Sequence, residues 1–263
     1  MGKIIAVANQ KGGVAKTTTC INLGASFVAT KRRVLVVDID PQGNATVGSG
    51  INKDGIDKSS YHVLLGKVPA AEAIVHAEAS DYDILPTNGD LTAAEVELMN
   101  MSVAREQRLR QALEPVRDNY DYILIDCPPS LNMLTLNAMV AADSVMIPMQ
   151  CEYYALEGLS ALLNTIEEIR GSVNPKLEIE GLLRTMYDPR NNLSTDVSGQ
   201  LILHFGDKVY RTVIPRNVRL AEAPSHGMPV LNYDRTSRGA VAYLALAGEI
   251  LRRSTGQPHS AVV

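Results

Sequence analysis

The residues of this chain most able to do chemistry lie in a glycine-rich segment close to the N-terminus. Residues 3–8 read Lys-Ile-Ile-Ala-Val-Ala, which is typical of a buried strand, and a helical pattern covers residues 16–30. The loop between them, residues 9–15, reads Asn-Gln-Lys-Gly-Gly-Val-Ala, and the helix then opens with Lys16 and three threonines. In such a strand–loop–helix unit, backbone N–H groups converge on phosphate oxygens. The segment therefore predicts a phosphate-binding loop.

Two side chains at the end of this loop have expected roles in binding a nucleotide. Lys16 brings a positive charge to the β- and γ-phosphates of a nucleotide, and the Thr17 hydroxyl is placed to ligate Mg²⁺. The general pattern is G-x-x-x-x-G-K-[ST], and this chain has Gln10 at its first glycine and Ala15 at its second. A glycine turn that binds nothing is the alternative, and the Lys-Thr pair that opens the helix argues against it. The residues expected around the phosphates are Gly12, Gly13, Val14, Ala15, Lys16, Thr17 and Thr18.

Two later apolar runs each end in aspartate. Residues 34–37 lead into Asp38-Ile-Asp40, and residues 122–125 lead into Asp126. Carboxylates at the carboxyl ends of parallel strands point into the ligand crevice, and they are costly there unless they serve a metal, a water molecule or a hydrogen bond. We expect Asp126 to hold Mg²⁺ directly or through water, and Asp40 to position the attacking water. Asp38 is expected to accept hydrogen bonds beneath the loop; a helix cap or a turn is the alternative for each.

Several segments resemble the ParA/MinD family of ATPases, whose deviant phosphate loop reads K-G-G-x-G-K-[ST]. The loop of this chain departs from that pattern only at Ala15. Residues 38–44, Asp-Ile-Asp-Pro-Gln-Gly-Asn, match the family's switch I, and residues 125–130, Ile-Asp-Cys-Pro-Pro-Ser, match its Walker B and switch II. The likeness covers about residues 3–250, is closest to the ParA/Soj branch, and includes the further segments 148–158 and 214–225.

This resemblance implies an ATPase that acts as a homodimer. ATP and Mg²⁺ would be held between two protomers, and Lys11 would be the family's signature lysine, which binds the partner protomer's nucleotide. The catalytic residues would be Lys11, Lys16 and Asp40, because water attacks the γ-phosphate in line and positive groups stabilise the developing charge. Asp126 would also bind the cofactor, and the metal would be held by Thr17, Asp40 and Asp126.

The family also implies partners and a location. ParA proteins bind double-stranded DNA without sequence preference as ATP-bound dimers, and a ParB-type centromere-binding protein stimulates hydrolysis and releases them. The expected function is segregation of a chromosome or plasmid by an ATPase that is slow without its partner. It would lie in the cytoplasm on the nucleoid, with no membrane partner. The three cysteines form no Cys-x-x-Cys pair, which suits a reducing compartment.

Arginine accumulates in the C-terminal third of the chain. Arg190 and Arg219 stand at positions that match the family's DNA-binding surface, whereas the alternative is a scatter of solvated side chains. Contacts to phosphate need only a local basic patch, so the net charge of −4 is compatible with DNA binding. Segments that surround the adenine base in relatives match Met186 and the turn Pro215, Arg216 and Asn217, for which an ordinary turn is the alternative. The arginines of residues 184–238 are Arg184, Arg190, Arg211, Arg216, Arg219, Arg235 and Arg238.

Other functions stay open at this point. A MinD-like positioning ATPase would need a C-terminal amphipathic helix, and residues 252–263 show no amphipathic period. A reductase similar to the nitrogenase iron protein would need paired cysteines, and Cys127 has no second cysteine in a suitable context. A cargo-positioning protein or nucleotide-locked scaffold with weak hydrolysis is the third alternative, because Ala15 departs from the family pattern.

These side chains need a scaffold that brings several strand ends together. Strands apolar on both faces alternate with helical patterns, which predicts a doubly wound α/β fold of the P-loop NTPase class: a mostly parallel sheet with helices on both faces. Thr92-x-x-Glu95 predicts a capping box ahead of a helix. The expected strands are 3–8, 33–37, 82–85, 122–125, 144–148 and 179–183, and the expected helices are 16–30, 105–117, 156–170 and 240–253.

Length and composition agree with this scaffold. Of the 263 residues, 46% are hydrophobic and 21% charged, which excludes disorder for most of the chain. Tryptophan is absent and phenylalanine occurs twice, so the core must be mainly aliphatic. We expect one P-loop ATPase domain over residues 1–253 and a flexible tail over residues 254–263.

Overall fold

The computed structural model describes residues 1–153 and 155–255. Among these residues seven strands form one sheet in the order β3-β4-β2-β5-β1-β6-β7. Neighbouring strands are parallel except for β3 with β4. The predicted doubly wound, mostly parallel sheet is therefore confirmed. The strands are β1 (Lys3–Val7), β2 (Val34–Asp38), β3 (Val75–Ala77), β4 (Tyr82–Leu85), β5 (Tyr122–Asp126), β6 (Ser144–Gln150) and β7 (Glu178–Thr185).

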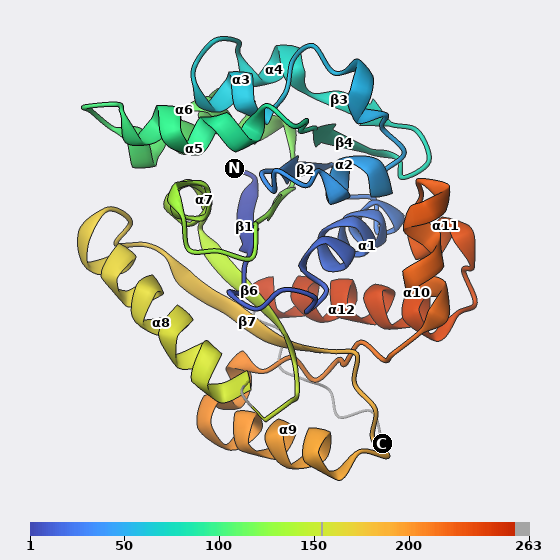
Figure 1. Cartoon of the computed structure of the whole chain (residues 1–263). Helices are drawn as coiled ribbons and strands as arrows, with labels where there is room; N and C mark the ends of the chain where they lie inside the picture. The colour runs from blue at the N-terminus through green and yellow to red at the C-terminus, as the bar shows by residue number, and fades with distance from the viewer. Residues whose placement is uncertain (154, 256–263) are drawn as a thin grey trace.

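Helices cover both faces of this sheet (Figure 1). The α-helices are α1 (Lys16–Ala29), α2 (Asn44–Gly48), α3 (Ser60–Leu64), α4 (Ala70–Ala73), α5 (Leu91–Met99), α6 (Arg108–Leu113), α7 (Met133–Ala141), α8 (Ala155–Ser172), α9 (Asn192–Phe205), α10 (Val218–Glu222), α11 (Val230–Tyr233) and α12 (Arg238–Ser254). Short 3₁₀ helices are η1 (Lys53–Gly55), η2 (Arg105–Gln107), η3 (Glu114–Asn119), η4 (Gly206–Lys208) and η5 (Ala223–His226).

Alternate side chains of each central strand enter two different cores. From β1, Ile4 and Ala6 pack in the core beneath α3 to α9, whereas Ile5 and Val7 pack beneath α1 and α10 to α12. Strands β2 and β5 are buried at every position, which explains their continuous apolar sequences. Both cores are mainly aliphatic, as expected. The sheet is thus rigid on both sides, and its strand ends are fixed points for the residues that follow them.

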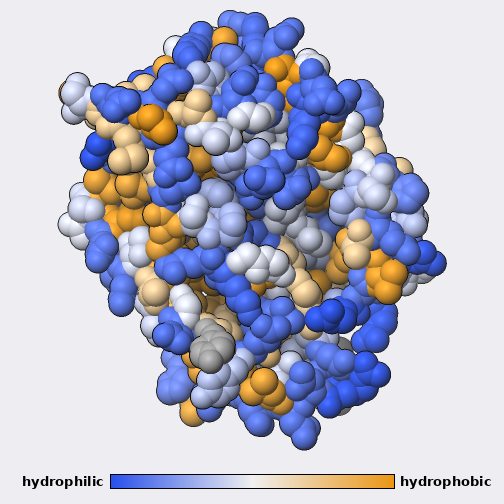
Figure 2. All heavy atoms as spheres, viewed as in Figure 1, coloured by the Kyte–Doolittle hydropathy of each residue, from blue (hydrophilic) through white to orange (hydrophobic). Residues whose placement is uncertain are grey.

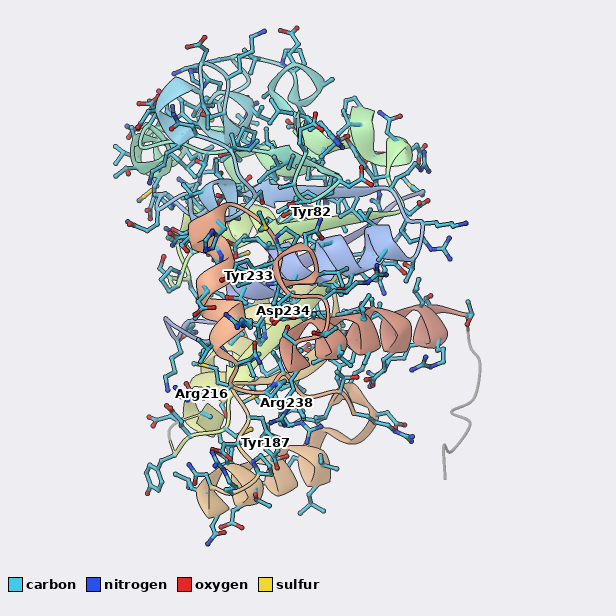
Figure 3. All side chains as sticks on the ribbon, turned by 90° about the vertical axis from the view of Figure 1, so that its right-hand side faces the viewer. Tyr82, Tyr187, Arg216, Tyr233, Asp234 and Arg238 are labelled. Carbon is cyan, nitrogen blue, oxygen red and sulfur yellow. The ribbon has the colours of Figure 1, made fainter. Side chains whose placement is uncertain are left out.

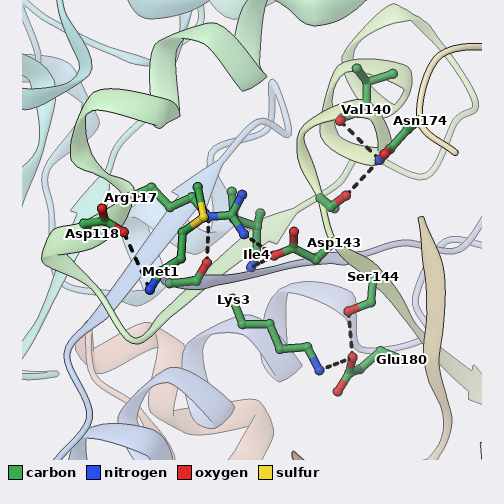
Figure 4. A network of polar contacts seen from close by, with 12 residues as sticks. Met1, Lys3, Ile4, Arg117, Asp118, Val140, Asp143, Ser144, Asn174 and Glu180 are labelled. Atoms are coloured by element: carbon green, nitrogen blue, oxygen red, sulfur yellow. Dashed lines mark hydrogen bonds and ion pairs between the residues drawn. The ribbon is translucent and has the colours of Figure 1, made fainter. Parts of the chain in front are cut away.

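A polar network ties the amino ends of the central strands together (Figure 4). Asp143 accepts a hydrogen bond from the Ile4 backbone N–H at 2.8 Å and pairs with Arg117 at 2.6 Å. Glu180 pairs with Lys3 at 2.7 Å. These contacts lie at the edge of the sheet remote from the glycine-rich loop, and they join the start of β1 to Asp143, just before β6, and to Glu180 of β7, the strand beyond β6. They support the scaffold and not the site.

Two local expectations are wrong. Thr92 lies inside α5, which begins at Leu91, so the capping box is absent; the Glu95 carboxylate instead accepts a hydrogen bond from Asn132 at 3.0 Å. The helix expected over residues 105–117 is divided into η2, α6 and η3. Pro115 is the second residue of η3, and it interrupts the α-helix because proline lacks an N–H and its ring clashes with the preceding turn.

The C-terminal boundary shifts slightly from the expected one. Helix α12 continues to Ser254, one residue past the expected end of the domain, and residues 256–263 of the expected tail lie outside the described residues. Among the described residues, no helix is both long and apolar enough to span a membrane. The face in Figure 2 is mainly hydrophilic, and apolar side chains gather at its left edge, near α5 and α7. Exposed apolar residues of that region are Val96, Met99 and Leu131.

Candidate active site

The glycine-rich loop joins the carboxyl end of β1 to the amino end of α1, as the sequence predicts. Gly13 has a φ of 73° and Ala15 has a φ of 68° with a ψ of 34°, so two residues of the loop are left-handed. Ala15 is the N-cap residue of α1, and no side chain of the described residues caps this helix end. The first N–H groups of a helix have no partner within it. Those of α1 are therefore available to an anion.

Lys16 is buried at the start of α1, with 7% of its surface exposed. Its Nζ donates a hydrogen bond to the Lys11 carbonyl oxygen at 3.1 Å, so the ammonium lies over the loop. Burial lowers the pKa of Lys16, and the negative charge of Asp126 opposes that effect only in part. A phosphate at the loop would supply the negative charge that this buried ammonium needs.

Asp126 is fully buried at the end of β5 and accepts a hydrogen bond from the Thr17 hydroxyl at 2.7 Å. The strand register sets Asp126 opposite Asp38 of β2. Burial raises the pKa of Asp126 well above its usual range, and the neighbouring charge of Asp38 adds to the shift. Hydroxyl and carboxylate oxygens are ligands that Mg²⁺ prefers, and a cation would stabilise the two charges. Thr17 and Asp126 therefore fit a magnesium site that is completed by phosphate.

Asp38 and Asp40 differ in their hydrogen bonds. Asp38 accepts bonds from the Thr46 N–H at 2.8 Å, the Thr46 hydroxyl at 2.7 Å and the Asp40 N–H at 3.2 Å. Burial raises the pKa of Asp38 to about 6, although these bonds act against the shift. Asp40 is 7% exposed and accepts a bond from the Gln42 N–H at 3.0 Å. Asp38 thus accepts hydrogen bonds from Asp40 and Thr46. Its expected place beneath the glycine-rich loop, and the roles of Asp40 in water positioning and metal binding, remain predictions. No cluster of three His, Cys, Asp or Glu side chains within the described residues is arranged to hold a metal by itself.

Lys11 is exposed on the outer side of the loop. Its ammonium pairs with the Glu152 carboxylate of the segment after β6, and both side chains are 45% exposed. The Lys11 N–H donates to the Asn9 side chain at 2.9 Å. Lys11 therefore projects away from the Lys16 ammonium and toward the surface. Its predicted contact with a partner protomer's nucleotide requires the ion pair with Glu152 to open.

A cavity of about 190 Å³ lies beside the amino end of α1. It brings together the predicted phosphate-loop residues Ala15 and Thr18 with all four residues predicted at the adenine base. An isolated parallel β-bridge between Tyr187 and Pro215 joins the segment after β7 to the turn at residues 215–217. The lining residues are Ala15, Thr18, Met186, Ile214, Pro215, Arg216, Asn217, Leu220, Ala221 and Tyr243.

Known proteins share this arrangement over nearly the whole chain. A family model described as an AAA domain matches residues 2–179. The chain is 54% identical over 253 residues to the chromosome partitioning protein ParA of Caulobacter vibrioides, a match that covers 95% of this chain and 94% of that protein. It is 55% identical over 250 residues to the sporulation initiation inhibitor protein Soj of Bacillus subtilis, covering 95% and 98%. This chain is a member of the ParA/Soj family.

A solved structure supports the ParA/Soj fold. The crystal structure of cobyrinic acid a,c-diamide synthase from Mycobacterium smegmatis with bound ATP analog and magnesium has a TM-score of 0.85 to this chain. The two are 38% identical, and the match covers 98% of each. The predicted P-loop fold class is therefore confirmed.

The two arginines predicted to contact DNA in this ParA/Soj family member are exposed at the surface. Arg190 follows Asp188 and forms two bonds to its carboxylate, at 2.9 and 2.8 Å, while its side chain stays 88% exposed. Arg219 on α10 pairs with Glu222 at 2.8 Å and with Asp234 at 3.3 Å. The bond to Arg190 lowers the pKa of Asp188 to about 2. Both arginines are thus accessible but already paired with carboxylates.

The basic region is smaller than the run of arginines in the sequence. Arg184 is 7% exposed, and its guanidinium donates to Ser198 and to the Tyr210 carbonyl, so it is no part of a surface patch. Figure 3 shows Arg216 and Arg238 near Tyr187 on one side of the molecule. Arg216 and Arg238 are both exposed.

Sequence reasoning missed two kinds of residue in this ParA/Soj site. Glu152 lies in a segment that matched the family, but its contact with Lys11 joins residues 141 positions apart. Tyr243 lines the cavity from α12, far along the chain from the loop. No local pattern marks either residue, because each acquires its place only when the helices pack on the sheet.

Proposed function

We propose that this chain is a DNA-partition ATPase that binds ATP and Mg²⁺, dimerises around them, and binds DNA in that state. The convergence of Thr17, Lys16 and Asp126 at one strand–loop–helix unit carries the proposal. It joins a phosphate cradle, a buried positive charge and an oxygen ligand set for a divalent cation. The Caulobacter relative is a chromosome partitioning protein by name.

The proposed hydrolysis uses groups already described. The N–H groups of the loop and of α1 bind the phosphates, and Lys16 stabilises negative charge on the γ-phosphate as water attacks it in line. Mg²⁺, when bound through Thr17 and Asp126, would neutralise charge on the phosphate oxygens. Asp40 orients the attacking water. Lys11 of the partner protomer completes the charge stabilisation, so full activity requires the dimer.

The base and the DNA are assigned to neighbouring regions. The adenine base enters the cavity that Met186, Pro215 and Asn217 line, and DNA phosphates contact Arg190 and Arg219 beside it. Duplex DNA is bound through its backbone and without sequence preference. A ParB-type protein accelerates hydrolysis, the dimer dissociates, and the chain leaves the nucleoid. These steps segregate a chromosome or plasmid.

Turnover measurements test the proposal directly. ATP hydrolysis is measured with the chain alone, with duplex DNA, and with DNA plus a ParB-type protein from the same genome. We expect slow turnover alone and a clear increase with DNA and partner together. Stimulation by anionic lipid vesicles instead would favour a MinD-like function. Binding and dimerisation with no turnover in any mixture would favour a nucleotide-locked scaffold, and failure to bind ATP would refute the proposal.

A further inference from the structure

The left-handed conformation of Ala15 is held by hydrogen bonds from two threonine side chains, one on β7 and one on α1. The peptide planes on either side of a residue determine its φ and ψ, and these two planes carry the carbonyl groups of Val14 and Ala15. The Thr185 hydroxyl, at the end of β7, donates to the Val14 oxygen at 3.0 Å. The Thr19 hydroxyl, on α1, donates to the Ala15 oxygen at 2.7 Å. Both planes are therefore held by side chains.

A second layer supports the first. The Thr19 oxygen lies 3.1 Å from the Tyr243 hydroxyl of α12. A threonine hydroxyl has one proton, and that of Thr19 is donated to Ala15, so the Tyr243 hydroxyl is the donor in this pair. Thr19, Thr185 and Tyr243 are each 0% exposed. In such surroundings a hydrogen bond is strong, and a hydroxyl or carbonyl that loses its partner is costly.

Thr185 also connects the two halves of the candidate site. It is the last residue of β7, and the next residue, Met186, is itself left-handed with a φ of 48°. Met186 and Ala15 line the same cavity. The hydroxyl of Thr185 thus links the phosphate loop to the segment assigned to the base, across 171 positions of sequence.

We propose that Thr185 is a positioning residue that, together with Thr19 and its partner Tyr243, holds the phosphate loop of this chain in its binding conformation despite the alanine at position 15. This rests on the proposed nucleotide binding. Glycine populates left-handed conformations without a steric penalty, whereas alanine does so only with strain. These hydrogen bonds, which we call the loop clamp, are therefore more important with Ala15 than they would be with glycine.

A double-mutant cycle on the full chain tests this dependence. ATP affinity is measured by calorimetry for the parent chain, Thr185→Val, Ala15→Gly and the variant that carries both changes. We expect Thr185→Val to weaken ATP binding about tenfold, which corresponds to about 1.4 kcal/mol, and to weaken it threefold or less when position 15 is glycine. A residue that only supports the end of β7 would cost the same factor in both backgrounds.

Three further variants complete the test. Thr185→Ser keeps the hydroxyl and should restore affinity to within about twofold of the parent. Tyr243→Phe removes only the supporting hydroxyl and should weaken ATP binding less than Thr185→Val does. It provides a second test if Thr185→Val fails to fold. Thr165→Val is the matched control, because the Thr165 hydroxyl donates to the Ala161 carbonyl on the exposed face of α8. It should leave ATP affinity unchanged.

The results that would overturn the proposal are specific. Equal losses with alanine and with glycine at position 15, or a serine variant as weak as the valine one, would remove Thr185 from loop positioning. If no variant binds ATP, the proposed function fails, and the same cycle is then read from urea unfolding of the nucleotide-free protein. In that measurement, Thr185→Val should lower the free energy of unfolding less with glycine at position 15 than with alanine. An equal decrease in both backgrounds would refute the loop clamp.

Discussion

At the residue scale, Ala15 shows that a sequence pattern can locate a loop without predicting its backbone conformation. The motif places an alanine where the family has glycine, and the structure adds that this alanine holds a φ of 68°. A left-handed φ cannot be deduced from residue type, because alanine itself favours negative φ. The strain and the hydrogen bonds that hold it are therefore structural findings.

We expect Ala15→Gly to stabilise the protein. Relief of the left-handed strain outweighs the larger chain entropy of glycine, so the free energy of unfolding should rise by about 1 kcal/mol. The measurement is urea unfolding of the nucleotide-free protein. ATP-dependent dimerisation and partner-stimulated turnover should rise as well, since the loop then closes with less strain. Identical unfolding midpoints for the two proteins would show that alanine is tolerated at no cost.

Lys11→Ala should separate nucleotide binding from dimerisation. Lys11 lies on the outer side of the loop and Lys16 over its centre, so the variant should bind ATP within about twofold of the parent yet form no ATP-dependent dimer in analytical ultracentrifugation. Glu152→Gln is the matched control, because it breaks the same ion pair and keeps the lysine. Dimerisation by Lys11→Ala, or its loss in both variants alike, would contradict a role for Lys11 in the partner protomer.

At the scale of elements, Asp38 joins β2 to α2. Its carboxylate accepts hydrogen bonds from Thr46 of α2, and the Thr46 hydroxyl in turn accepts one from the Thr87 N–H at 2.9 Å, after β4. Three elements thus meet at one buried carboxylate. The position of Asp38 at a strand end was predictable from the apolar run before it, but its partners were not, because they depend on which strands are neighbours in the sheet.

The raised pKa of Asp38 makes stability depend on pH in a defined direction. Its pKa rises from 3.8 when unfolded to about 6 when folded, so the folded state binds more protons across this interval. Stability from this group is present at low pH and decreases as pH rises from about 4 to 6. Between pH 5 and 7 the loss should be about 1 to 2 kcal/mol.

Urea unfolding at pH 5 and pH 7 of the parent and of Asp38→Asn measures this contribution. Other acids with lowered pKa, such as Asp121, change stability in the opposite sense. The comparison with the variant removes their contribution and reports Asp38 together with the part of the Asp126 shift that the Asp38 charge causes. The stability lost on going from pH 5 to 7 should be smaller in Asp38→Asn. The same pH dependence in both proteins would show that Asp38 titrates normally in the fold.

Whether a segment forms a strand or a helix was predictable where its pattern of apolar residues was unambiguous. The buried strands β1, β2 and β5 are continuous apolar runs, and the loop after β1 carries its own motif, so fold class and phosphate site followed from local sequence. Short helices were less predictable. Thr92 and Glu95 have capping-box spacing inside a helix, since Leu91 is buried and starts the turn one residue earlier.

At the scale of the whole molecule, charge is locally paired on the face that should meet DNA. Arg190 and Arg219 are bonded to Asp188 and to Glu222 and Asp234, so a phosphate must replace a carboxylate as well as a counterion. The sequence predicted which arginines were candidates. It could not show that Arg219 also pairs with Asp234 after α11, or that Arg184 of β7 is buried against Ser198 of α9, because both contacts depend on how elements pack.

Charge reversal at these arginines should weaken binding of any duplex sequence to a similar degree. For Arg190→Glu and for Arg219→Glu we expect ATP-dependent DNA retention to fall, and the slope of log affinity against log salt to decrease by about 0.9 for each lost phosphate contact. ATP affinity should not change. Retention on biotinylated duplexes across a salt series gives both values.

Arg170→Glu is the matched control for this series. Arg170 on α8 is 44% exposed and pairs with Glu167 three residues earlier, much as Arg219 pairs with Glu222 three residues later. It should retain DNA like the parent chain. Unchanged retention in one of the two test variants would exclude that arginine from the DNA surface, and a strong preference for one sequence would exclude a backbone-only contact.

The uncapped start of α1 also determines how fast its backbone amide protons exchange with solvent. The N–H groups of Lys16, Thr17 and Thr18 precede Thr19, whose N–H is bonded to the Ala15 carbonyl at 2.9 Å. In deuterated solvent those three amides should exchange at nearly the rate of an open chain, although they border a buried core. Bound nucleotide should slow them sharply. The start of α9, which the Asn191 side chain caps, should exchange at the same rate in both cases. Mass spectrometry of the two peptides would then report occupancy of the site independently of turnover.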